Sequence, residues 1–109
     1  MTSSVETLIS AVERLPAVTV QIHDEARSAR VHVGARQVAS IDLRDGALLV
    51  HAPVERRPIL QRAFPSCRPA ADGIAFDLAD PRGHEEGLAA LRGRVNAERL
   101  GWQLDVASP

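Results

Sequence analysis

The side chains that could carry chemistry lie on alternate positions of four predicted strands between residues 18 and 51. In the register that we predict for these strands, one polar row crosses all four, formed by Gln21, Arg30, Ser40 and His51. The neighbouring rows hold Thr19 and His32 on one side and Ser28 and Asp42 on the other. An arginine presents a planar fork of donors that suits a carboxylate or a phosphate. The row is therefore a candidate site for an anionic ligand.

The candidate ligand-binding residues are Gln21, Arg30, His32, Ser40, Asp42 and His51. A simpler interpretation is that they form the solvated outer face of a sheet, held by cross-strand hydrogen bonds and charge pairs. We favour this simpler interpretation because strand alternation alone places polar residues on an outer face. The ligand hypothesis stays open beside it.

The other reactive residue types form no recognisable constellation in the sequence. The four histidines lack the spacing of metal ligands, and no Cys-x-x-Cys pair or carboxylate cluster completes a set. Cys67 lies next to Arg68, which favours a thiolate, but no base is evident, and a small buried filler is the favoured interpretation. No glycine-rich phosphate loop follows a strand. We predict no catalytic residue, no metal and no cofactor.

The four strands are predicted from strict alternation of apolar and polar residues, the period of a half-buried strand. Between the third and fourth runs, Asp45-Gly46 is typical of a tight type I′ hairpin turn. If Arg44 opposes Ala47 in that turn, then Leu43 opposes Leu48, Ile41 opposes Val50 and Ser40 opposes His51. The apolar partners then share one face, as a buried side requires.

Helices are predicted before and after this meander in the chain. Residues 3–15 have an apolar stripe at helical spacing and a capping box formed by Ser3 and Glu6. A second helix is predicted over residues 54–64, with Ile59, Leu60, Ala63 and Phe64 toward the core. A fifth strand follows at 74–78, and Asp80-Pro81 begins the last helix. Gly101 is expected to end that helix, and 102–106 could add a short edge strand or simply cover the core.

The order is helix, four strands, helix, strand, helix, which predicts an α+β two-layer sandwich with an antiparallel meander and helices on one face. With 109 residues, the chain is expected to be a single domain over 1–109, with a loose tail at about 107–109. A net charge of −1 and 3% aromatic residues argue against a nucleic-acid binder. One cysteine and no long apolar run predict a soluble cytoplasmic protein without a membrane partner.

The run GARQVASIDLRDGALLVHAPVERRPIL at 34–60 resembles the middle of a small bacterial family usually labelled luciferase-like domains. The similarity includes a Gly-x-Arg-Gln start, a hairpin and an arginine-rich helix, and continues in DGIAFDL at 72–78 and LAALR at 88–92. It covers roughly residues 8–96. The resemblance implies a small α+β domain and neither light emission nor a catalytic set. The element order is also similar to the double-wing fold of YjbR-like proteins.

These observations predict a non-enzymatic α+β module that binds a small molecule or a protein partner, or assembles with itself through a sheet edge as a homodimer. The alternative is an enzyme or anionic-ligand-binding accessory domain that uses the polar outer face. A concave pocket where Arg30, His32, Asp42 and His51 converge would favour the alternative.

Overall fold

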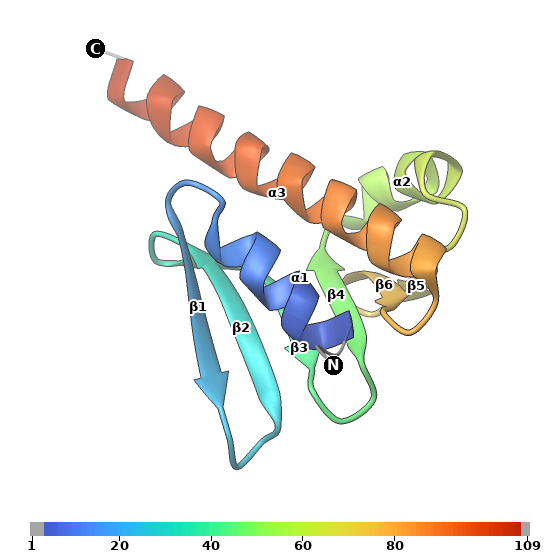
Figure 1. The fold of residues 1–109 in the computed structure, drawn as a ribbon. Coiled ribbons are helices and arrows are strands. Elements are labelled where there is room, and N and C mark those ends of the chain that lie inside the picture. Colours follow the sequence, from blue (N-terminus) through green and yellow to red (C-terminus); the bar gives the residue numbers. More distant parts are fainter. Residues whose placement is uncertain (1–3, 108–109) are drawn as a thin grey trace.

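The computed structural model describes the backbone of residues 4–107 and the side chains of residues 4–100, as one sheet layer covered by helices (Figure 1). Its elements in chain order are α1 (Ser4–Glu13), β1 (Val18–His23), β2 (Ser28–Val33), β3 (Arg36–Asp42), β4 (Ala47–His51), the 3₁₀ turn η1 (Val54–Arg56), α2 (Arg57–Ala63), β5 (Arg68–Ala70), β6 (Gly73–Asp77) and α3 (Pro81–Ala107). The predicted α+β fold and its element order are confirmed. The predicted capping box involves Ser3, which lies outside the described residues.

The sheet has six antiparallel strands in the order β1-β2-β3-β4-β6-β5. The additional strand is β5, a three-residue strand that contains Pro69 and was not predicted. A proline is tolerated there because β5 lies at the edge of the sheet and pairs only with β6. The meander predicted from alternation is therefore confirmed, and the sheet has one further short strand at its edge, beyond β6.

The β3–β4 hairpin has a different register from the predicted one. Ile41 opposes Leu48 and Ser40 opposes Leu49, a displacement of two residues along β4. The Asp42 carboxylate accepts hydrogen bonds from the backbone N–H groups of Arg44 (2.9 Å) and Asp45 (3.0 Å), which stabilises a four-residue loop over 43–46. Because the displacement is even, every side chain still lies on its predicted face.

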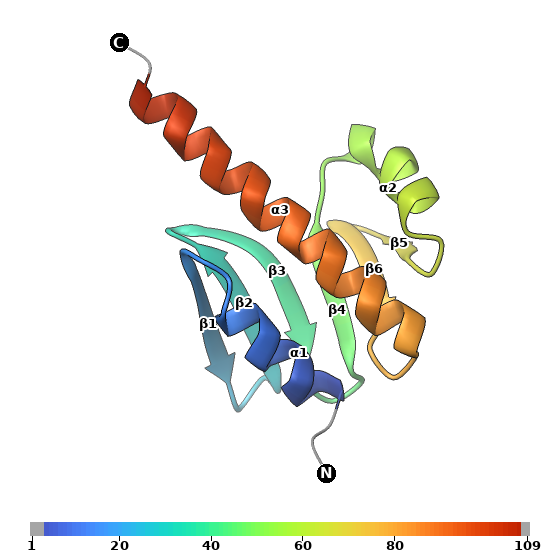
Figure 2. The ribbon, with the colours of Figure 1, turned by 45° about the horizontal axis from the view of Figure 1, so that its top comes forward.

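The core lies between the sheet and the helices, and all its fully buried side chains are apolar. Leu8 and Val12 of α1 and Leu91 and Val95 of α3 are buried against the sheet face that we call the inner face. Figure 2 shows α1 and α3 crossing this face. The opposite, outer face has no helix over it among the described residues (Figure 2).

Helix α2 lies beside the first half of α3, at the β6–β5 end of the sheet (Figure 1). It has no fully buried residue, and its contact with the core is made by Leu60 and Phe64. The rings of Phe64 and Phe76 meet edge to face, with centroids 6.1 Å apart. The prediction that Ile59 faces the core is wrong, because its side chain is 67% exposed, and Ala63 is exposed as well.

Helix α3 begins as predicted, since the Asp80 carboxylate accepts a hydrogen bond from the backbone N–H of Arg82 (3.1 Å). It does not end at Gly101 but continues to Ala107, so the predicted edge strand at 102–106 is wrong. A single glycine costs a helix only about 1 kcal/mol, which is too little to end it. No helix of the described residues combines the length and apolar character that a membrane span requires.

Replacement of Gly87 and of Gly93, both in the middle of α3, by alanine should have opposite effects on stability. A Cβ at position 87 would lie 3.0 Å from Leu48 Cδ2 and 3.2 Å from two atoms of Phe76, whereas a Cβ at position 93 meets nothing within 4 Å. Gly93→Ala should raise the free energy of unfolding by about 1 kcal/mol through helix propensity. Gly87→Ala should lower it by about 1 kcal/mol, because overpacking outweighs the same propensity gain. Urea unfolding of the two variants measures these changes. Equal changes in the free energy of unfolding would contradict the close contact at Gly87.

Candidate functional site

The polar row predicted on the outer face is partly assembled. Gln21 opposes Arg30, and Arg30 opposes Ser40, as predicted. His51 is not in this row, because the hairpin displacement places Leu49 opposite Ser40. His51 instead pairs with Gly73 at the end of β4. The row therefore continues into apolar residues rather than into a histidine.

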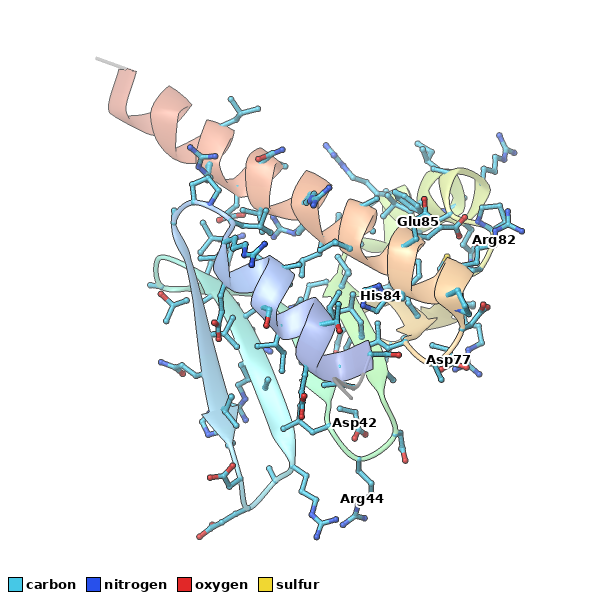
Figure 3. The ribbon with its side chains drawn as sticks, in the orientation of Figure 1. Asp42, Arg44, Asp77, Arg82, His84 and Glu85 are labelled. Atoms are coloured by element: carbon cyan, nitrogen blue, oxygen red, sulfur yellow. The ribbon has the colours of Figure 1, made fainter. Side chains whose placement is uncertain are left out.

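The flanking positions are also only partly available for a ligand. Thr19 opposes His32, and Ser28 opposes Asp42, as predicted. The Asp42 carboxylate, however, is engaged by its own turn, and the backbone N–H groups of Asp45 and Arg44 lower its pKa. Figure 3 shows Asp42 and Arg44 at this hairpin end of the sheet. His51 and Asp42 lie at opposite ends of the β3–β4 pair, so the predicted set does not converge on one point.

A groove of about 690 Å³ lies on the inner side of the sheet, between η1–α2 and α3. Its floor is formed by Val50 and Ile74 of the strands. Its lining residues are Arg36, Val50, His51, Ala52, Pro53, Arg56, Leu60, Phe64, Ile74, Ala89, Ala90, Gly93, Arg94 and Ala97. Of the candidate residues proposed from sequence, only His51 belongs to this groove.

The groove exists because the α3 wall is built from small residues. Ala89, Gly93 and Ala97 recur at a spacing of four, which places them on one side of the helix. Facing them, Arg56, Leu60 and Phe64 recur at the same spacing along η1 and α2. The larger side chains do not reach across, since a Cβ at position 93 would have no neighbour within 4 Å.

Arg57 holds the α2 wall in place. Its Nε donates to the carbonyl of Ala52 (3.2 Å), and its Nη2 donates to the carbonyl of Ala71 (2.8 Å). These bonds join the start of α2 to the segment after β4 and to the loop before β6. Arg57 therefore has a structural role in this helix.

Two polar clusters connect the ends of the groove to α3. At one end, Arg94 donates to the carbonyl of His51 (3.2 Å) and to Glu98 (2.8 Å), and Glu98 also pairs with Arg36 (3.2 Å). At the other end, Glu86 accepts hydrogen bonds from the backbone N–H (2.9 Å) and hydroxyl (2.5 Å) of Ser66. The α2–β5 loop and the end of β4 are thus both attached to the same helix.

The charged residues that line the groove, within the part of the chain that the structure describes, are all arginines: Arg36, Arg56 and Arg94. Arg36 and Arg94 share Glu98, whose side chain is 14% exposed. Arg56 is exposed on η1, and its guanidinium has no partner among the described residues. The groove therefore combines an apolar interior with a positively charged rim. In the sequence, the signal for this groove is the spacing of the small residues Ala89, Gly93 and Ala97. A search for stripes of large apolar residues does not detect it.

Cys67 lies outside this arrangement. Burial raises the pKa of its thiol, and the nearby Glu86 carboxylate raises it further. A thiol with a raised pKa is a weak nucleophile at neutral pH, so the interpretation of Cys67 as a packing residue is the better one. Over residues 4–100, no group of three or more potential metal ligands is found.

Comparison of the chain with protein-family models, with curated proteins and with solved structures finds no match. The site is therefore interpreted from its own geometry.

The Ser66–Glu86 contact predicts a specific acid sensitivity. The Ser66 hydroxyl and backbone N–H lower the pKa of Glu86 from its ordinary 4.5 in the folded protein. A lowered folded-state pKa stabilises the protein above the unfolded-state value and ceases to do so as the pH falls through the folded-state value. Glu86→Gln should therefore be less stable than the wild type at pH 7 and lose less stability on acidification below pH 4.5.

The matched control is Glu85→Gln, which removes the exposed neighbouring carboxylate (Figure 3). Urea midpoints measured at a series of pH values should decline in this control as in the wild type. Identical acid profiles for the two variants would contradict the role of the Ser66–Glu86 bonds.

Proposed function

We propose that the protein is a non-enzymatic binding module whose groove between η1–α2 and α3 takes a small molecule with an apolar body. The observation that carries the proposal is the groove itself, about 690 Å³ in volume with a mostly apolar lining. Small-molecule sites fall in the range of about 300–1,000 Å³ and have this mixture of apolar walls and few polar groups.

Binding rather than catalysis is supported by the residues that line the groove. Within the described residues, His51 is the one histidine in the lining, and alternation along β4 places its side chain on the face opposite to that of Val50. No serine, threonine, cysteine or carboxylate stands beside it in the lining to complete a nucleophile–base pair. The alternative, an enzyme or anion-binding site on the outer face, has less support, because Asp42 is engaged in its turn and His51 has left the row.

The proposal extends to family and location. We propose that the chain is a bacterial luciferase-like domain of the cytoplasm. The support for this is the sequence resemblance over about residues 8–96 and the single cysteine.

Filling the groove tests the proposed site. Gly93→Leu should add a side chain into open space without a backbone clash, so the protein should remain folded. We expect 1-octanol, followed by ¹⁵N NMR titration, to bind the wild type and to bind this variant at least about tenfold more weakly, through steric exclusion. Arg92→Leu adds the same side chain at an exposed position outside the groove lining and should bind like the wild type. Unchanged binding in Gly93→Leu would refute the site.

A second candidate function, self-assembly, is favoured by the free edge of β1. Among the described residues β1 pairs only with β2, and its sequence VTVQIH contains neither a charged residue nor a proline. The opposite edge, β5, is short and carries Arg68 and Pro69, features that protect an edge from pairing. A two-fold axis through Val20 would pair Val18 with Ile22, and Ile22 is 53% exposed in the monomer. We propose an antiparallel β1–β1 homodimer as this alternative.

Charge placement on β1 tests the dimer. In the two-fold arrangement Thr19 opposes Gln21 of the second copy, so Thr19→Lys with Gln21→Lys should dissociate the dimer by repulsion. Thr19→Lys with Gln21→Glu places opposite charges at the same positions and should restore the dimer. Sedimentation velocity measures both, and a monomeric wild type would exclude this assembly.

A further inference from the structure

We propose that the molecule bound in the groove is an anionic amphiphile, a short apolar chain ending in a carboxylate or a phosphate, with its head at Arg56. This inference rests on the proposed function, because it names the chemical class that the same groove would select.

The two ends of the groove differ in polarity. On the η1–α2 wall the lining residues run from Pro53 and Arg56 to Leu60 and Phe64. On the α3 wall the Arg94 bond to His51 marks one end, and the Glu86 bonds to Ser66, two residues after Phe64, mark the other. The lining is therefore charged at the His51 end and apolar at the Phe64 end, where Glu86 and Ser66 lie outside it.

The charged end gathers its arginines from three separate elements. Arg36 begins β3, Arg56 closes η1 and Arg94 lies in α3. The start of β3 and the end of β4 lie at the same end of the sheet, since the two strands are antiparallel. His51, the last residue of β4, also lines the groove there.

The charges at this end are not balanced. Glu98 pairs with both Arg36 and Arg94, so one carboxylate faces two guanidinium groups. Arg56 adds a further positive charge, and its guanidinium has no partner among the described residues. A guanidinium that forms no intramolecular bond can give its whole donor fork to a ligand oxyanion. The residual positive charge favours an anion over a neutral or cationic head.

The apolar end of the groove determines which kind of chain the ligand can carry behind its anionic head. From Ala97 to Ala89 the α3 wall rises by eight residue steps, or about 12 Å at 1.5 Å per step. The space along it is bounded by Leu60, Phe64 and Ile74, none of which offers a hydrogen-bonding side chain. An extended chain of medium length fits such a channel, whereas a sugar or a nucleotide would leave its polar groups unpaired.

The test uses three probes with the same eight-carbon chain and different heads: sodium octanoate, 1-octanol and octylammonium chloride. Dissociation constants come from ¹⁵N NMR titrations at pH 7 and low salt. We expect octanoate to bind about tenfold more tightly than 1-octanol, as one charge-assisted contact allows, and octylammonium to bind most weakly. The advantage of octanoate should shrink at high salt, because exposed charges are screened.

Two variants locate the head. Arg56→Gln should reduce the affinity for octanoate to that for 1-octanol and leave 1-octanol binding unchanged. Arg62→Gln removes an exposed arginine of α2 that does not line the groove, and it should change neither affinity. Because the Arg56 side chain forms no hydrogen bond or ion pair with the described residues, its replacement should leave the fold intact, which the NMR spectrum itself reports.

The outcomes separate the two claims. Equal binding of octanoate and 1-octanol would overturn the anionic head and leave the proposed groove function in place. An octanoate preference that survives Arg56→Gln would overturn the role of Arg56. Failure of all three probes to bind would overturn both the inference and the proposed function.

Discussion

The close contact of α3 with the sheet at Gly87 is the constraint on which the other features of the molecule depend. Leu48 and Phe76 occupy the space where a Cβ of residue 87 would lie. The helix can therefore approach β4 and β6 closely enough to bury Leu91 and Val95. Six residues further along, Gly93 has no neighbour at its Cβ position. The same residue type thus permits contact at one point of α3 and leaves open space at the other.

The sequence was sufficient for the four strands of the meander and their faces, because burial on one side imposes alternation on every strand of a meander. It was not sufficient for the hairpin register. Alternation is unchanged by a displacement of two residues, and the choice depended on the Asp42 carboxylate, which accepts two backbone hydrogen bonds in a longer loop. The end of α3 was missed for a similar reason. Gly101 is a local signal, and a helix can continue through one glycine at modest cost.

The candidate site could not be derived from any single segment. The outer-face row joined residues that neighbouring strands bring together, so its first members, Gln21, Arg30 and Ser40, were placed correctly. The groove instead joins Arg36, Arg56 and Gly93, which come from three distant parts of the chain. Its position depends on Arg57, whose side chain reaches two backbone carbonyls across the sheet end. Periodicity in the sequence does not reveal these two long-range hydrogen bonds of the Arg57 side chain.

The way in which α2 is attached is compatible with the proposed function, in which α2 forms a wall that admits a ligand. It buries no residue fully and is held by the Phe64–Phe76 ring contact, by Arg57 and by the Ser66–Glu86 bonds that follow it. Elements with few buried apolar contacts open at a lower free energy than the core does. Displacement of α2 would therefore widen the groove while the α1–sheet–α3 core, with Leu8, Val31 and Leu91 at zero exposure, stays intact. The α2 wall of the groove and the stable part of the fold are thus separate structural units.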